Sequence, residues 1–238
     1  MENKAVSVER IEITGQTEGN LATLVKSSFD RALVFDGKIP KELLELHGMS
    51  GKKYRFFINN LVGDIIDARY LEIGSWAGST LCSAIFGNKV KALAIDNWSE
   101  FGGPAAKFFT NIGTFVSASN SVSIITSDFR NVSYQHIGHF NVFLYDGPHA
   151  QQDQYDGLHL ALSALDEEFV FIVDDWNWDY VRAGTFEAIK DNRCEIVYSL
   201  EVFSTENNMH PNEIGLQSEH NSDWHNGYFI SVVRKNMS

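Results

Sequence analysis

Hydrophobic residues along the chain follow two periods, and the change from one to the other falls near residue 67. Between residues 20 and 67, apolar side chains recur every three or four positions, which places them on one face of a helix. From residue 70 onward, short apolar runs alternate with helical patterns, as in parallel βαβ units. We predict seven strands, at Tyr70–Ile73, Ala92–Asp96, Val122–Thr126, Asn141–Tyr145, Phe169–Val173, Ile196–Phe203 and Tyr228–Arg234.

The order of these elements predicts a doubly wound α/β fold with a seven-stranded, mostly parallel sheet and an N-terminal helical segment. The middle strands are continuous apolar runs, as expected where both faces of a parallel sheet are covered. The last two are longer and alternate more, so we expect them to pair antiparallel at one edge. We therefore expect residues 1–66 to form a helical extension or cap and residues 67–238 to form the ligand-binding α/β domain.

The segment from Tyr70 to Thr80, with the sequence YLEIGSWAGST, is the most informative part of the chain. Gly74 and Gly78 are separated by three residues, so the dinucleotide fingerprint G-x-G-x-x-G is absent, and no Gly-Lys-Ser/Thr marks a P-loop. Asp96 ends the next strand, where a carboxylate can hold the two hydroxyls of a ribose. The pattern predicts a nucleoside-binding crevice at the carboxyl edge of the sheet. The alternative is a strand-to-helix turn that binds nothing.

Acidic residues stand at or near the ends of the first five predicted strands. They are Glu72, Asp96, Asp128, Asp146 and the pair Asp174-Asp175. Converging carboxylates repel one another and resist desolvation unless a cation or hydrogen bonds compensate their charge. Mg²⁺ prefers oxygen ligands, and Asp146 with the pair Asp174-Asp175 can supply three of them. Asp174 or Asp175 can alternatively cap the helix that begins near Asp179, and both interpretations stay open.

The pattern E-x-G-x-x-x-G-S-T at residues 72–80, together with Asp96, resembles the first motif of class I S-adenosylmethionine-dependent methyltransferases. The resemblance covers residues 65–235 and implies a Rossmann-like sheet with S-adenosylmethionine as cofactor. It implies cofactor contacts at the first three strand ends, from Glu72, Gly74, Ser75, Gly78, Ser79, Asp96, Trp98, Asp128 and Phe129. The residues alone leave other roles open, because Asp128 can cap a helix, and Trp98 and Phe129 can belong to the core.

The acids at the fourth and fifth strand ends resemble the metal site of O-methyltransferases of the catechol and macrocin types. This resemblance implies Asp146, Asp174 and Asp175 as ligands of Mg²⁺ or a similar divalent cation. The chain departs from the catechol type, which has a lysine where His149 stands, and from the macrocin type, which has an acid where Pro148 stands. We assign His149 as the general base beside Asp146, because a histidine of near-neutral pKa can accept a hydroxyl proton. The alternative is a histidine that caps a helix or bonds Asp174.

The function implied is transfer of a methyl group from S-adenosylmethionine to a hydroxyl of a sugar, phenol or natural product, assisted by Mg²⁺. Two alternatives remain, a metal-independent methyltransferase acting on nitrogen or oxygen and a non-catalytic nucleoside-binding protein. Trp176, Trp178 and Tyr180 can form the wall of an acceptor pocket or pack the following helix. We expect acceptor choice to lie in the N-terminal helices and in the segment Ser204–Asp223.

Net charge and composition limit the classes of partner that we expect for this chain. The formal net charge of -12 argues against binding nucleic acid through its phosphates, so we expect a small-molecule acceptor and no nucleic-acid partner. No apolar run has the length of a membrane span or the form of a secretory signal, so we expect no membrane partner and a cytoplasmic location. A homo-oligomer is compatible with the sequence. His210, His220 and His225 match no zinc-ligand spacing, and we expect exposed histidines on a polar loop.

Overall fold

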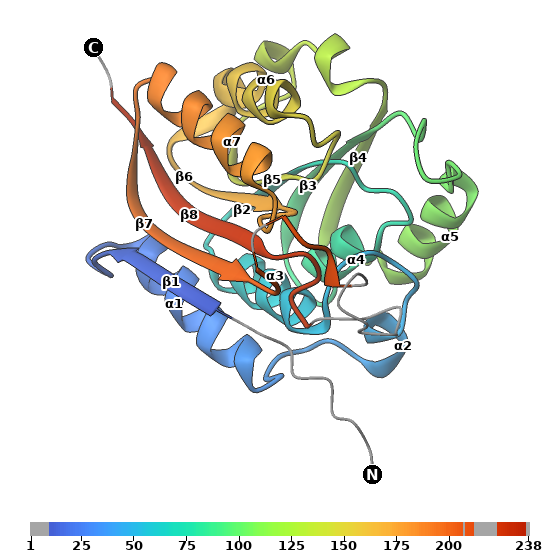
Figure 1. Cartoon of the computed structure of the whole chain (residues 1–238). Helices are drawn as coiled ribbons and strands as arrows, with labels where there is room; N and C mark the ends of the chain where they lie inside the picture. Colours follow the sequence, from blue (N-terminus) through green and yellow to red (C-terminus); the bar gives the residue numbers. More distant parts are fainter. Residues whose placement is uncertain (1–9, 207, 212–222, 237–238) are drawn as a thin grey trace.

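In the computed structural model, which describes residues 10–206, 208–211 and 223–236, one eight-stranded sheet runs through the molecule (Figure 1). Its strands are β1 (Arg10–Gly15), β2 (Ala68–Ile73), β3 (Val90–Asp96), β4 (Asn120–Thr126), β5 (Phe140–Tyr145), β6 (Leu165–Asp174), β7 (Cys194–Phe203) and β8 (Tyr228–Lys235). Their order across the sheet is β1-β7-β8-β6-β5-β2-β3-β4. Strands β2 to β6 are parallel, whereas β8, β7 and β1 pair antiparallel. The predicted mostly parallel α/β sheet is therefore confirmed.

The sheet has one strand more than the seven predicted. The additional strand, β1, lies at the edge of the sheet (dark blue in Figure 1) and pairs antiparallel with β7, from Arg10 opposite Phe203 to Gly15 opposite Tyr198. All six of its residues are exposed. Residues 10–14 do alternate polar and apolar side chains, but only Ile11 and Ile13 are apolar and both are exposed, so this short pattern was not among the strands we predicted.

Helices cover both faces of the sheet. Those in the described part of the chain are α1 (Asn20–Leu33), α2 (Lys41–Leu44), α3 (Lys52–Asp64), α4 (Ser79–Ile85), α5 (Ala105–Phe115), α6 (Gln151–Ala161) and α7 (Asp179–Asp191). Helices α1, α3, α4 and α5 pack on one face, and α6 and α7 pack on the other (Figure 1). Among the described residues, no helix has the length and apolar character that crossing a bilayer requires.

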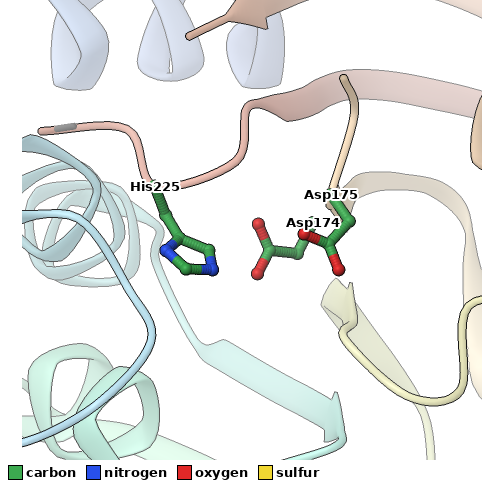
Figure 2. A group of neighbouring side chains, drawn as sticks. All are labelled: Asp174, Asp175 and His225. Carbon is green, nitrogen blue, oxygen red and sulfur yellow. The ribbon is translucent and has the colours of Figure 1, made fainter. Parts of the chain in front are cut away.

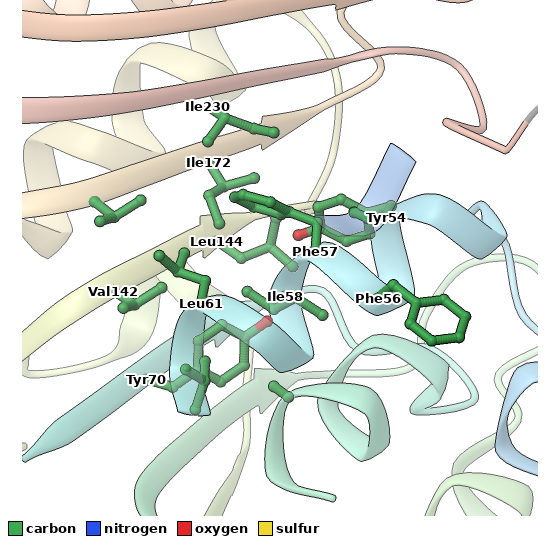
Figure 3. Close-up of a cluster of buried hydrophobic side chains, with 14 of the residues drawn as sticks. Tyr54, Phe56, Phe57, Ile58, Leu61, Tyr70, Val142, Leu144, Ile172 and Ile230 are labelled. Carbon is green, nitrogen blue, oxygen red and sulfur yellow. The ribbon is translucent and has the colours of Figure 1, made fainter. Parts of the chain in front are cut away.

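Side chains of each central strand alternate between two hydrophobic cores. Tyr70 and Leu144 face the core beneath α3, whereas their neighbours Leu71 and Phe143 face the core beneath α6 and α7. Figure 3 shows the first core, where Phe57 of α3 lies close to Leu144. Because both faces are buried, the strands appear in the sequence as continuous apolar runs.

The N-terminal segment shares the first of these cores. The helical periodicity of residues 20–67 is realised in α1 and α3. Val25 and Phe29 of α1 are buried in the same cluster as Leu61 of α3 and the strand residues. The segment therefore packs directly on the sheet, and the division between residues 1–66 and 67–238 stays a prediction.

A buried arginine holds the loop between α2 and α3. The side chain of Arg55 on α3 is 0% exposed, and burial lowers its pKa to about 10, which leaves it charged at neutral pH. Its guanidinium donates at 2.8–3.3 Å to the hydroxyl of Ser50 and to the carbonyls of Leu43, Leu44, Leu46 and Gly48. The same loop brings His47 and Met49 to the cavity at the sheet edge, so Arg55 positions one wall of that cavity.

Candidate active site

A cavity of about 630 Å³ opens at the carboxyl ends of the parallel strands. This is the edge at which open α/β sheets bind ligands. Most of the predicted site residues line it, namely Gly74, Asp96, Trp98, Asp128, Phe129, Asp146, His149, Asp174 and Asp175. The others lie outside its wall, in or beneath the loop after β2: Glu72, Ser75, Gly78 and Ser79.

The glycine loop after β2 makes contacts that exclude a side chain. Gly74 has a φ of 84°, in the left-handed region that favours glycine. A Cβ atom there would lie 1.9 Å from the carbonyl oxygen of Asp146, so the loop touches the backbone that follows β5. Gly78, with a φ of 83°, precedes α4, and a Cβ atom there would lie 2.9 Å from the ring of Phe108. Packing and backbone conformation therefore both require these glycines.

The carboxylate of Asp96 at the end of β3 braces this loop. Its Oδ2 accepts hydrogen bonds from the amides of Ser75 at 2.7 Å and Trp76 at 2.8 Å, and its Oδ1 accepts one from the amide of Trp98 at 2.6 Å. A carboxylate offers about four acceptor positions, so roughly one is left for a ligand. The sequence did not reveal this bracing role, and contact with ribose hydroxyls stays a prediction.

Glu72 supports the loop from beneath. Its side chain is 0% exposed, and its carboxylate accepts hydrogen bonds from the hydroxyls of Tyr70 at 2.5 Å and Ser75 at 2.6 Å. Burial raises the pKa of Glu72 to about 8 in spite of these bonds. Ser79 is also buried, with its hydroxyl 3.0 Å from that of Ser50. Cofactor contacts from Glu72 and Ser79 therefore stay predictions, and the observed contacts are structural.

Replacing Glu72 with glutamine is expected to change how the free energy of unfolding depends on pH. The folded-state pKa is raised, so the protonated carboxyl stabilises the wild-type fold at low pH, and this stability is lost as pH rises toward about 8. This loss in the free energy of unfolding amounts to about 1.4 kcal/mol for each unit by which the pKa of Glu72 is raised. The neutral amide of glutamine does not titrate, so the variant does not lose stability in this way. In urea unfolding, the free energy of unfolding of Glu72→Gln should increase relative to that of the wild type between pH 5 and pH 8. A difference in the free energy of unfolding that stays constant with pH would contradict this prediction. Glu167→Gln, at an exposed position, is the control.

Asp128 and its neighbours combine the roles that the sequence left open. Asp128 accepts a hydrogen bond from the amide of Arg130 at 2.9 Å and so caps the 3₁₀ turn that follows β4, and it also lines the cavity. Trp98 lines the cavity while its ring packs on Phe108 at a centroid distance of 5.1 Å. Phe129 is buried and borders the same space. Asp128 therefore caps a turn and lines the cavity, whereas Trp98 and Phe129 pack against the hydrophobic cores and also line the cavity.

Three side chains near the ends of β6 and β8 face one another (Figure 2). One ligand atom from each of Asp174, Asp175 and His225 lies within 4.8 Å of the others. The Oδ1 atom of Asp174 is buried and has no hydrogen-bond partner among the described residues. Burial, together with the charges of Asp146 and Asp175, raises the pKa of Asp174 well above its ordinary value. A cation between these carboxylates would relieve their repulsion, so the residues fit a divalent metal ion.

His149, the predicted general base, forms an ion pair with two of the acids. Its Nε2 lies 2.5 Å from Oδ2 of Asp175 and 3.8 Å from Oδ1 of Asp146. Burial would lower the pKa of His149, but the two carboxylates outweigh burial and raise the pKa well above neutrality. The near-neutral pKa expected from the sequence is therefore not found. Unless a cation compensates the carboxylates, His149 already holds a proton at neutral pH and cannot accept another.

His225 was expected on an exposed loop, and the structure places it in the cavity wall. It precedes β8, whose Tyr228 lies opposite Asp174 of β6, and the amide of Asn177 donates to the carbonyl of Asn226 at 3.1 Å. This pairing brings His225 beside the acids that end β6. The missing signal was strand order, because the sequence predicted that the last two strands pair with each other but not that β8 lies beside β6. Burial lowers the pKa of His225 to about 4, so its ring is neutral at pH 7.

The predicted aromatic cluster divides between wall and core. Trp178 and Tyr180 line the cavity and stack on each other, with ring centroids 5.8 Å apart and an interplanar angle of 16°. Trp176 is fully buried and stacks on Phe229 of β8. Trp178 and Tyr180 therefore remain as candidates for contact with an acceptor.

The segment Ser204–Asp223, in which we expected part of the acceptor specificity, falls mostly outside the described residues. Its described part is residues 204–206, 208–211 and 223. His210 lies in this part and lines the cavity, whereas His220 is outside it.

Comparison with known families matches the segment that builds this edge of the sheet. Residues 71–176 match the family model described as a methyltransferase domain. The match includes the glycine loop, Asp96 and the acids that end β5 and β6. Residues 71–176 are therefore similar to a methyltransferase domain.

Several solved structures share the fold of this chain. An O-methyltransferase from Bacillus cereus in complex with SAH has a TM-score of 0.56 at 16% identity, and the likeness covers 90% of this chain and 100% of that one. TrmN from Thermus thermophilus has a TM-score of 0.55 at 13% identity, covering 82% of this chain and 52% of that one. This chain therefore spans about half the length of TrmN. No curated protein matches the chain by sequence.

The expectation that nucleic acid is excluded as a partner is wrong. PH1948 from Pyrococcus horikoshii, whose assignment as an RNA methyltransferase is provisional, has a TM-score of 0.52 at 13% identity, covering 89% of this chain and 99% of that one. The expectation rested on the net charge of -12. Net charge is an average over the whole surface and does not describe the local potential around a cleft, so it cannot exclude an RNA acceptor.

Proposed function

We propose that the whole protein transfers a methyl group from S-adenosylmethionine to a hydroxyl of a small molecule, and that Asp146, Asp174 and Asp175 hold a divalent cation during the reaction. One observation carries the proposal. The glycine loop and Asp96 open onto the same cavity as these three acids. The cavity volume of about 630 Å³ is typical of small-molecule sites, which allows a cofactor and a small acceptor to lie in it together.

The donor half of the proposed site is the side bounded by Gly74, Asp96, Trp98 and Asp128. Two carboxylates suit a ligand that carries an ammonium and a sulfonium group. The ring of Trp98 offers an aromatic face, and its indole nitrogen donates to the carbonyl of Trp76 at 2.9 Å, which fixes its orientation. These contacts support binding of S-adenosylmethionine with its methyl group toward the acids that end β5 and β6.

The acceptor half lies by the three acids. Trp178 and Tyr180 border it as a stacked pair, and flat aromatic walls of this kind suit sugars and phenols. His47 and Met49, on the loop held by Arg55, also border the cavity. A small hydroxyl compound could therefore contact aromatic and polar groups at once.

The carboxylates and His149 would handle the metal ion and the proton. A divalent cation, when bound, lowers the pKa of a hydroxyl group and orients its oxygen. In the proposed reaction the acceptor oxygen bonds to the methyl carbon, the carbon–sulfur bond breaks, and the hydroxyl proton passes to His149. His149 can take this proton only when the charge of Asp146 and Asp175 is compensated, because those carboxylates otherwise keep it protonated.

Calorimetric titration with S-adenosylhomocysteine tests the donor half. We expect micromolar binding that survives EDTA. Asp96→Ala should weaken it roughly 10- to 100-fold, because three loop amides lose an acceptor at a cost of about 1–3 kcal/mol. Asp191→Ala, at the exposed end of α7, is the matched control and should bind as the wild type does. Absence of binding under every condition would contradict the proposal.

An acceptor screen tests the other half. Methyl transfer from labelled S-adenosylmethionine would be measured on catechols, sugars and RNA, each with divalent metal and with EDTA. Transfer to hydroxyl compounds that EDTA abolishes would support the proposal. Transfer to RNA alone would replace the small-molecule acceptor, and transfer that survives EDTA would remove the cation from the mechanism.

A further inference from the structure

His225 reaches the proposed metal site from a different part of the chain than the acids do. It lies before β8, fifty residues after Asp175, and one of its ring nitrogens is within 4.8 Å of carboxylate oxygens of Asp174 and Asp175. Figure 2 shows its ring directed toward the two acids. Both His225 and Asp175 adopt left-handed backbone conformations, with φ of 45° and 60°. Such conformations cost free energy in residues other than glycine and are concentrated at functional sites.

A largely buried polar network joins the backbone of His225 to the side chain of Asp175. Asn226 donates to Oδ1 of Asp175 at 2.6 Å, and Asn177 donates to Oδ1 of Asn226 at 2.8 Å and to the Ser204 hydroxyl at 3.0 Å. The Ser204 hydroxyl in turn donates to the carbonyl of His225 at 2.7 Å. The side chains of Asn177, Ser204 and Asn226 are 0% exposed. Networks of this kind orient metal ligands in many proteins.

One acceptor in this cluster has no partner. The Oδ1 atom of Asp174 is buried, its side chain is 3% exposed, and no described residue donates a hydrogen bond to it. Leaving a buried carboxylate oxygen unsatisfied is costly. The cluster therefore contains one side chain held by a hydrogen bond, that of Asp175, a histidine whose backbone is held, and an unsatisfied oxygen, and its ligand atoms are close enough to share one ion.

We propose that His225 is a nitrogen ligand of the divalent cation at Asp174 and Asp175, and that it makes the site prefer a first-row transition ion such as Mn²⁺ or Co²⁺ over Mg²⁺. Mg²⁺ is bound in proteins almost entirely through oxygen, whereas imidazole nitrogen suits transition ions. The proposal rests on the proposed function only in the assignment of the two acids to a cation. It does not depend on the acceptor or on methyl transfer.

Spin-echo measurement on the Mn²⁺-loaded protein tests the ligand directly. The wild type should show modulation from a coordinated ¹⁴N nucleus, and His225→Ala should lose it. Manganese titration followed by the signal of free Mn²⁺ should show affinity falling by at least about tenfold in His225→Ala. His136→Ala, at an exposed position outside the cavity, is the control and should keep both properties.

A second variant separates loss of the ligand from loss of the fold. Asparagine tolerates a left-handed backbone, so His225→Asn should keep the loop while replacing the nitrogen donor with oxygen. We expect wild-type protein to bind Mn²⁺ at least about tenfold more tightly than Mg²⁺, and His225→Asn to reduce that ratio. Modulation that persists in both variants would assign the nitrogen to His149 and overturn the proposal, as would bound Mn²⁺ without nitrogen coupling.

The same samples distinguish this proposal from the proposed function. S-adenosylhomocysteine binding in EDTA reports the donor half without metal. A protein that couples Mn²⁺ to nitrogen but binds no S-adenosylhomocysteine would retain the ligand assignment and lose the methyltransferase mechanism. The converse result, cofactor binding and turnover without nitrogen coupling, would overturn the assignment of His225 alone.

Discussion

Asp174→Asn is expected to slow methyl transfer by about 10²- to 10⁴-fold, with little change in S-adenosylhomocysteine affinity. Asparagine keeps the shape of the side chain but gives up its charge and one of its two oxygen ligands. Metal ions contribute several kcal/mol to stabilising developing charge, and each 1.36 kcal/mol corresponds to about tenfold in rate. Turnover at saturating cofactor and metal, measured beside calorimetric binding of S-adenosylhomocysteine, checks both parts of this expectation.

The same substitution is expected to stabilise the metal-free protein. Burial and two neighbouring acids raise the pKa of Asp174, so the ionised carboxylate destabilises the fold at neutral pH. Stability that the protonated form provides at low pH is lost as pH rises through the raised pKa, whereas the amide is unaffected. Thermal unfolding in EDTA should therefore show a gain for Asp174→Asn that is larger at pH 8 than at pH 5. Gains in stability at the cost of activity are typical of functional sites.

The matched control for both measurements is Asp191→Asn on the exposed end of α7. It should change neither turnover nor the pH dependence of unfolding. Full turnover by Asp174→Asn would exclude Asp174 from the mechanism. A lower melting temperature in EDTA would contradict the view that its buried charge is uncompensated without a cation.

Arg55→Met is expected to lower the free energy of unfolding by about 3 kcal/mol, because the guanidinium is replaced by a group that cannot donate hydrogen bonds. Four carbonyls between residues 43 and 48 and the Ser50 hydroxyl lose their donor together. For a chain of this length the melting temperature should fall by roughly 10 °C. The loop that carries His47 and Met49 should also loosen, so we expect a higher KM for the acceptor in the folded variant.

Two further variants define this effect. Arg55→Lys keeps the charge but offers three donors from one point instead of a planar fork, so it should recover only part of the stability. Arg234→Met removes an exposed arginine that pairs with Glu168 and should change the melting temperature little. If Arg55→Met melted like the wild type, the loop would be held by contacts other than the guanidinium.

Most of the fold could be predicted because the strands that build it are buried on both faces. Tyr70–Ile73 and Phe169–Val173 appear as apolar runs since their alternate residues enter two separate cores. Arg10–Gly15 was missed because its alternation rests on two apolar residues, Ile11 and Ile13, which are both exposed. The strand is held at the edge of the sheet by its hydrogen bonds to β7 and not by burial of its side chains.

The sequence predicted the site residues that lie at strand ends. It did not predict the features that depend on the order of the strands in the sheet or on the distances between charged groups. Asp174 ends β6 and Asp175 follows it directly, so their place at the cavity could be inferred from the chain. His225 enters only through the pairing of β8 with β6. The pKa of His149 depends on its distances to Asp175 and Asp146, which no sequence spacing contains. Net charge failed for the same reason, since it carries no information on location.

The contact between Gly74 and the carbonyl of Asp146 joins the two halves of the cavity into one rigid frame. No side chain fits between them, so a substitution at Gly74 would move the donor loop away from the acids and could not be repaired by changes elsewhere in the wall. Trp178 and Tyr180 form a separate wall of the cavity, whereas His47, on the loop at Met49, packs on Trp76 of the glycine loop with ring centroids 5.1 Å apart. Under the proposed function, remodelling the wall formed by Trp178 and Tyr180 would change the acceptor while leaving the contact between Gly74 and Asp146 unchanged.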